Sequence, residues 1–181
     1  MISPLVAFDA RLSDSLVRWK AYKEGDNIIA RFTFDEWHKI AADIDSEKEL
    51  YELLTLYPHK IQGFVLYENS TDEAVGFVYL LKEKGKSKAV SYHGGGWGKS
   101  IKLSLLYYRG CILLIEYLLR LGYRVRTYCS VDNNRAYRFT HSLGFVLYRI
   151  SENRKYQWIN LNRLRASKIY KKISFPLQRK V

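Results

Sequence analysis

The chain has 181 residues, of which 48% are apolar and 27% charged, with three prolines and a formal net charge of +12. This composition excludes a disordered, collagen-like or low-complexity chain, and we see no internal repeat. The length suits one domain, residues 1–181, with room for a substantial core.

Two cysteines are too few for a disulfide framework, and no cysteine or histidine spacing is typical of a metal site. We therefore expect free thiols, a cytoplasmic protein and no metal. The most apolar stretch, residues 103–121, is interrupted by Arg109, Glu116 and Arg120, which predicts a buried helix and no membrane span.

Charge is divided unequally along the chain. Residues 1–83 carry nine Lys/Arg against fifteen Asp/Glu, whereas residues 84–181 carry twenty-one against three. A solvated basic surface, a nucleic-acid surface or a site for a polyanionic small molecule would each explain the second half. The basic extension, residues 162–181, also contains regularly placed apolar residues, which predicts a docked segment.

The first sixty residues are predicted to be mostly helical after a short strand, Leu5–Phe8. Two capping-box patterns, a Thr or Ser followed three residues later by Glu, mark the starts of two short helices. The first pattern is Thr33 with Glu36, and the second is Ser46 with Glu49. We interpret residues 1–60 as the part that would face an acceptor substrate.

The core, residues 61–161, is predicted to follow the order β-β-β-α-β-α-β-β. A strand–helix–strand unit over residues 89–129 implies a parallel pair with a crevice at the strand ends. This is an α/β (α+β) pattern, a mixed sheet with helices on its faces. The predicted strands are 61–67, 74–81, 89–93, 124–129, 144–150 and 156–161, and the helices 104–121 and 133–142.

A glycine-rich segment, His93–Ser100, lies between a predicted strand and a helix, where backbone N–H groups can bind phosphate. A nucleotide-binding P-loop would need a glycine where His93 stands. A β-bulge or wide turn, in which the glycines permit unusual backbone angles, is the alternative.

The segment Val131–Phe145 carries a sharper pattern. Asp132 or Asn133 would cap a short helix after a strand, and Gly144 would end it. The spacing of Asn133, Ala136, Gly144 and Phe145 resembles the Asn-x-x-Ala…Gly-Phe element of the GCN5-related N-acetyltransferase (GNAT) superfamily. Together with the element order, the resemblance covers about residues 61–161 and implies a splayed, mixed sheet that binds acetyl-CoA.

The resemblance also implies a pyrophosphate loop at the start of the long helix, where this chain lacks the family's glycines. Side-chain donors would replace them, and the family's pantetheine contacts would fall on the end of the preceding strand. The expected cofactor-binding residues are Gly96, Trp97, Gly98, Lys99, Ser100, Lys102, Ser104, Asn133 and Ala136.

For catalysis, the resemblance implies a group that protonates the leaving thiolate seven residues after the Asn, where this chain has Thr140 in place of a tyrosine. Tyr137, one turn earlier, is a substitute. His93 is the candidate general base by residue type, and a packed structural histidine is its alternative. His141 is expected at the surface.

These features favour an N-acetyltransferase that moves an acetyl group from acetyl-CoA to a primary amine of a small molecule or protein. The acidic half would draw the amine, and the basic half would hold coenzyme A. The alternative is an inactive GNAT-like module that binds nucleic acid or an acidic partner through the basic half.

Overall fold

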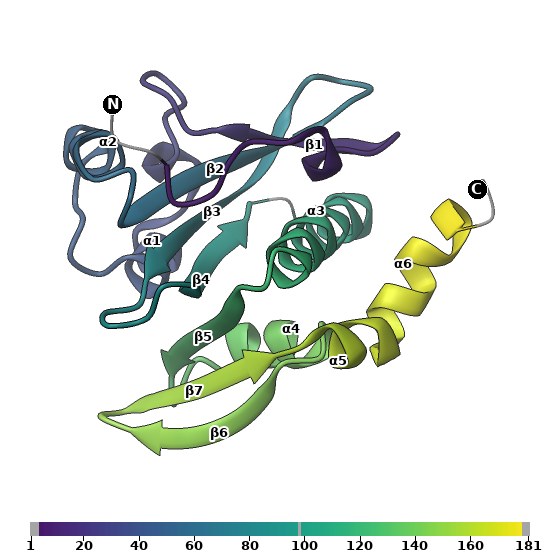
Figure 1. The fold of residues 1–181 in the computed structure, drawn as a ribbon. Coiled ribbons are helices and arrows are strands. Elements are labelled where there is room, and N and C mark those ends of the chain that lie inside the picture. Colours follow the sequence, from purple (N-terminus) through teal and green to yellow (C-terminus); the bar gives the residue numbers. More distant parts are fainter. Residues whose placement is uncertain (1–3, 98, 179–181) are drawn as a thin grey trace.

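A computed structural model describes residues 4–97 and 99–178 of the chain (Figure 1). In this part, seven strands form one sheet in the order β1-β2-β3-β4-β5-β7-β6. The strands are β1 (Val17–Ala21), β2 (Ile61–Glu68), β3 (Ala74–Lys82), β4 (Ala89–Gly96), β5 (Arg124–Ser130), β6 (Val146–Ser151) and β7 (Arg154–Ile159). The predicted meander of β2, β3 and β4 and the parallel pairing of β4 with β5 are confirmed.

The sheet is splayed at its centre. β4 and β5 pair only along Ala89–Ser91 and Arg124–Arg126, and the remaining residues of both strands diverge. Every other neighbouring pair of strands is antiparallel. The divergence leaves facing edges of two strands without a common ladder, at the crevice that the sequence predicted.

Helices cover both faces of the sheet, as expected. α1 (Phe34–Ile40) and α2 (Glu47–Leu56) pack with β2 and β3 in one apolar cluster around Trp37 and Phe77. Both predicted capping boxes are formed. α3 (Ile101–Arg120) and the helix α4 (Asn134–Ser142) lie on the other face, where α3 packs in the larger cluster. The left-handed Gly122, with φ of 82°, follows the end of α3.

The basic extension forms α5 (Leu161–Ala166) and α6 (Lys168–Gln178), which dock on α3. Leu164, Tyr170 and Ile173 are buried in the larger cluster, so the prediction of a docked segment is confirmed as far as Ile173. A buried ion pair between Arg109 of α3 and Asp14 lies beside it. None of the described helices is both long and apolar enough to cross a membrane.

Two local predictions were wrong. Leu5–Phe8 is not a strand. The first strand is β1, which pairs with β2 and lies between two 3₁₀ helices, η1 (Ala10–Leu12) and η2 (Ile29–Arg31). Gly94, Gly95 and Gly96 belong to β4 and pair with β3 in regular register, so no β-bulge interrupts them. The expected cofactor residue Gly98 lies outside the described residues.

Candidate functional site

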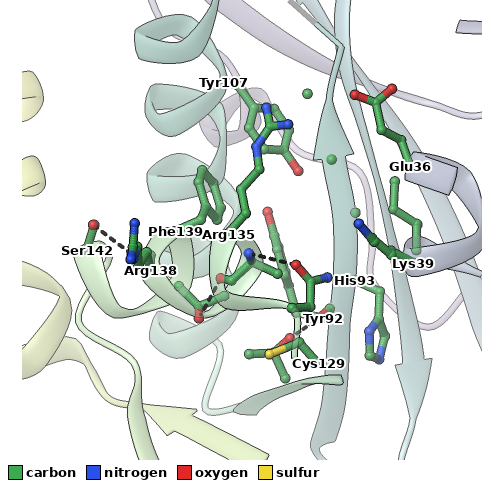
Figure 2. A pocket seen from close by; sticks show the side chains of 18 of the residues that line it. Glu36, Lys39, Tyr92, His93, Tyr107, Cys129, Arg135, Arg138, Phe139 and Ser142 are labelled. Carbon is green, nitrogen blue, oxygen red and sulfur yellow. Dashed lines mark hydrogen bonds between the residues drawn. The ribbon is translucent and has the colours of Figure 1, made fainter. Parts of the chain in front are cut away.

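A cavity of about 560 Å³ occupies the gap where β4 and β5 diverge. Figure 2 shows its walls: α4 with Arg135 and Phe139 on one side, and α1 with Glu36 and Lys39 on the other. The size is within the range of small-molecule sites. Because the divergence opens the sheet from face to face, the cavity is lined by residues of both helical layers.

The glycines of β4 form one edge of the cavity. Thr127 Oγ1 donates to the Tyr92 carbonyl at 2.7 Å, which shows that this carbonyl points toward β5. Since alternate residues of a strand direct their backbone groups to the same edge, Gly94 and Gly96 present N–H and C=O groups to the gap. This edge can pair with an extended ligand chain.

Glycine at position 96 is required by packing. A Cβ atom there would lie 2.9 Å from the ring of Tyr107, and one at Gly76 on β3 would lie 2.4 Å from the same ring. Tyr107, on α3, therefore lies flat on the β3–β4 ladder and also lines the cavity. The glycine-rich segment thus allows α3 to approach the sheet closely. From the sequence, the glycines were expected only to permit unusual backbone angles.

The Asn133–Gly144 segment folds as predicted and forms the opposite wall. The Asn133 side chain accepts from the Ala136 backbone N–H at 3.1 Å, which caps α4. Asn133, Ala136 and Thr140 all line the cavity. The two parts of the sequence that pointed to chemistry, the glycine run and this helix, therefore face each other across the gap.

A buried polar pair lies beneath α4. Thr140 Oγ1 donates to Gln157 Oε1 of β7 at 2.8 Å, and Gln157 is fully buried while lining the cavity. The Nε2 group of Gln157 has no hydrogen-bond partner among the described residues. An unsatisfied buried donor costs about 1–3 kcal/mol, so a ligand or a water that accepts this hydrogen bond is stabilised. Gln157 was not among the predicted residues, because a single Gln in a strand gives no signal.

His93 lies on the face of β4 toward α1 and lines the cavity. Its ring stacks on Tyr79 with centroids 5.2 Å apart and meets the edge of Tyr128 at 4.5 Å. Nε2 lies 2.7 Å from the Ser91 hydroxyl oxygen. Burial, with a smaller contribution from the positive charge of Arg154, lowers the pKa of His93 to about 4. The imidazole is therefore neutral near pH 7, able to accept a proton but a weak base.

The N-terminus of α3 brings fewer side chains to the cavity than the sequence predicted. Ser100 caps the helix by accepting from the Leu103 N–H, and Lys102 forms a 2.6 Å ion pair with Glu68. Lys99 is exposed, and Ser104 lines the cavity. Of these four expected phosphate-binding side chains, the structure therefore brings only Ser104 into the cavity wall.

Two further predicted residues lie outside the cavity wall. The Trp97 indole N–H donates to the Ala74 carbonyl, and its ring packs against Phe32 at 5.5 Å. Tyr137 stacks on His141, which is exposed as predicted, and lies beneath the Lys155 ammonium group. Thr140, the other candidate on α4, does line the cavity.

Cations at the cavity were not among the predicted residues. Lys39, Arg135 and Arg138 line it, against one carboxylate, Glu36. Backbone hydrogen bonding at Thr33, with a smaller contribution from the positive charges of Arg135 and Lys99, lowers the pKa of Glu36. The excess of positive charge favours an anionic ligand. Both arginines follow Asn133 within five residues, so the same helix that carries the motif also supplies the cations.

No model of a known protein family matches the sequence, and no curated protein matches it by sequence. Solved structures do match by fold. Spermidine N-acetyltransferase from Vibrio cholerae, in complex with CoA and spermine, has a TM-score of 0.63 at 15% identity, over 83% of this chain and 99% of that one.

Two more solved structures match this chain with similar TM-scores and similarly low identities. FdhC, described as a nucleotide-linked sugar GNAT, gives a TM-score of 0.62 at 14% identity, over 91% of this chain and 94% of the other. The Campylobacter jejuni N-acetyltransferase PseH, in complex with acetyl coenzyme A, gives 0.58 at 15% identity, over 81% and 99%. With its splayed seven-stranded sheet and helices on both faces, this chain has the fold of the GNAT superfamily.

Proposed function

We propose that this protein is an acetyl-CoA-dependent N-acetyltransferase that acts on a primary amine. The observation that carries the proposal is the cavity between β4 and β5, which is bordered by an unpaired strand edge and by α4. Structural neighbours with this fold include a complex with CoA and one with acetyl coenzyme A.

The residues of the cavity fit a CoA-type ligand. The edge of β4 at Gly94 and Gly96 would pair with the amide groups of the pantetheine chain. Arg135 and Arg138 on α4 would bind phosphate, together with Ser104 on α3 and the exposed Lys99. The Nε2 group of Gln157 supplies a buried donor that has no partner in the described part of the chain.

Acetyl-CoA supplies the activated thioester when it is bound, and the protein needs to orient the amine and move a proton. His93, neutral at pH 7, would accept the proton that the amine loses as its nitrogen bonds to the acetyl carbon. Thr140 holds the Gln157 amide by a 2.8 Å bond, and Gln157 Nε2 would donate a hydrogen bond to the sulfur as the carbon–sulfur bond breaks. Thr140 is then a positioning residue for Gln157.

Binding of acetyl-CoA is measured first, by thermal shift and by calorimetric titration at low and high salt. We expect a stabilising shift that weakens as salt rises, because phosphate contacts to arginine are screened. Absence of any shift at millimolar acetyl-CoA would contradict the cofactor assignment.

Transfer is then assayed by release of the CoA thiol with a panel of primary amines. His93→Ala should lower the rate with little change in acetyl-CoA affinity. An unchanged rate would remove His93 from the mechanism and leave it as a packed histidine. Steeply salt-dependent nucleic-acid binding without acetyl-CoA binding would overturn the enzyme proposal itself.

A further inference from the structure

One face of β5, β7 and β6 carries alternating tyrosines and arginines. We call the residues Arg126, Tyr128, Tyr148, Arg149, Arg154 and Tyr156 the aromatic–arginine face. Strand alternation places it opposite α4, because Gln157 and Lys155 contact α4 and their neighbours Tyr156 and Arg154 point the other way.

The three tyrosines form a row across three strands, and each is covered by an arginine. Ring centroids of Tyr128 and Tyr156 are 5.6 Å apart, and those of Tyr156 and Tyr148 are 6.4 Å apart. The guanidinium of Arg154 lies 4.7 Å from the Tyr128 ring, and that of Arg149 lies 4.2 Å from the Tyr156 ring. Arg126 lies 5.6 Å from the Tyr148 ring.

This face has no helical cover within the described residues. The apolar cluster formed with α1 and α2 draws on β2 and β3, and it includes no residue of β5, β6 or β7. Arg149 and Arg154 are exposed, and Tyr148 is 44% exposed. A row of large side chains on an uncovered sheet face is the kind of surface that a ligand can occupy.

The arginines of this face are positioned to bind an anion. A guanidinium that stacks on a ring keeps its N–H edge available and loses less conformational freedom when it binds phosphate. Arg126 is already paired with Glu83, at 3.3 Å. Arg149 and Arg154 form no ion pair with any carboxylate of the described residues.

The face is continuous with the cavity. Tyr128 lines the cavity and touches His93, with ring centroids 4.5 Å apart, and the guanidinium of Arg154 lies over the Tyr128 ring. Neighbouring strands lie about 4.8 Å apart, so β6 lies about 10 Å from β5 across the face. A molecule that extends from His93 over Tyr128 therefore reaches Arg154 first and Arg149 next.

Several carboxylates of the acidic half are already paired within the protein. Asp9, Asp14, Glu68, Asp72 and Glu83 are each engaged in an ion pair with an arginine or lysine. Glu36 is the one carboxylate among the described residues that line the cavity. The cavity wall therefore offers a cationic acceptor one carboxylate, against the cations Lys39, Arg135 and Arg138.

We propose that the acceptor is an amine that also carries a phosphate group, bound with its amine at His93 and its phosphate on Arg154 and Arg149. The inference rests on the proposed acetyl transfer and adds the class of acceptor. Tyr128 and Tyr156 would pack against the part of the acceptor between the two groups. The reaction itself is unchanged: an N–C bond forms, a C–S bond breaks, and the amine proton leaves to His93.

The test compares aminoalkyl phosphates of two to six carbons with the amino alcohols of the same length, with spermine as a cationic acceptor. We expect kcat/KM for the phosphates to exceed that for the alcohols by about 10- to 100-fold, as one or two charge-assisted bonds would give. The preference should depend on chain length, because the amine and the phosphate are held at fixed positions. Equal rates, or a preference for spermine, would overturn the proposal.

The variants Arg149→Gln and Arg154→Gln, alone and together, should remove the preference, because kcat/KM should fall more for the aminoalkyl phosphates than for the amino alcohols. Arg149→Lys and Arg154→Lys should keep part of it, since charge remains but the planar stack is lost. Lys171→Gln, at an exposed lysine of α6, is the control for loss of one positive charge. An unaltered preference in the double variant refutes the face as the phosphate site.

Failure of the proposed function is recognised separately. If no amine is acetylated, calorimetric titration of 6-aminohexyl phosphate into the wild type and the double variant still tests the face. Binding that the double variant loses supports the inference, and equal or absent binding overturns it. Light scattering tests whether a second copy of the chain covers this face. A dimer that Arg149→Glu dissociates would show that it does, and would overturn the inference.

Discussion

Replacing His93 by Gln should make the protein more resistant to acid. His93 is 8% exposed, and burial lowers its pKa to about 4 from an ordinary value of 6.5. The unfolded chain therefore binds more protons than the folded one between these two values, so folding stability falls as the pH is lowered through this window. Above pH 6.5 the ring is neutral in both states, and no such loss applies.

The expected size follows from the separation of the two pKa values. At pH 4.5 the folded state loses about 2.5 kcal/mol, because protonation of His93 is available almost only to the unfolded chain. In His93→Gln this loss is absent, although the stacking on Tyr79 and Tyr128 is weakened at every pH. The free energy of unfolding is measured by urea denaturation at pH 7.0 and 4.5 for both proteins.

The difference between wild type and variant should change by roughly 2 kcal/mol between the two pH values, in favour of the variant at pH 4.5. Contributions from carboxylates are shared by both proteins and cancel in this difference. His141→Gln, which removes an exposed histidine, is the control. A difference that does not vary with pH would refute the account of His93 as a desolvated neutral ring.

The remaining predictions concern the cavity wall. Gly76→Ala should cost about 1–3 kcal/mol of unfolding free energy, because the new methyl group meets the Tyr107 ring at 2.4 Å. Addition of Tyr107→Leu should recover most of that cost, and strict additivity of the two changes would argue against this cause. Alkylation of Cys129, which is half-buried at the cavity, should be slowed by acetyl-CoA. Cys111 should resist alkylation throughout, because burial raises the pKa of its thiol to about 12. Mass spectrometry of labelled peptides distinguishes the two cysteines, and equal labelling of Cys129 with and without acetyl-CoA would place the ligand elsewhere. Gln157→Leu should weaken binding of CoA more than that of desulfo-CoA, by calorimetry, since only CoA carries the sulfur; an equal loss for both ligands would mean that Gln157 acts through packing alone.

Much of the fold was predictable because its signals are local. The Ser46 and Thr33 capping boxes and the glycine after α3 each fix a helix end through neighbouring residues. The pattern of Asn133, Ala136, Gly144 and Phe145 similarly describes one helix and its exit into a strand. β1 was missed although its five residues alternate between apolar and charged, because the segment is short and its partner β2 lies about forty residues away.

The site was less predictable because its residues meet only through tertiary packing. Gln157 lies beside Thr140 because β7 pairs with β5 beneath α4, and nothing in the sequence near either residue signals this contact. The pairing of Lys102 with Glu68 likewise depends on how α3 lies over β2. Composition located positive charge in the second half but could not tell which arginines face a cavity and which are stacked on tyrosines.

The short contact between β4 and β5 has a consequence for how the molecule opens. Three residue pairs, the bond from Thr127 to the Tyr92 carbonyl and the ion pair of Arg126 with Glu83 join the two parts of the sheet, while α3 packs across the join. Amide hydrogens of β5, β6 and β7 should therefore exchange as one cooperative unit, separate from those of β2 and β3. Widening of the gap would then preserve the strand order of each part.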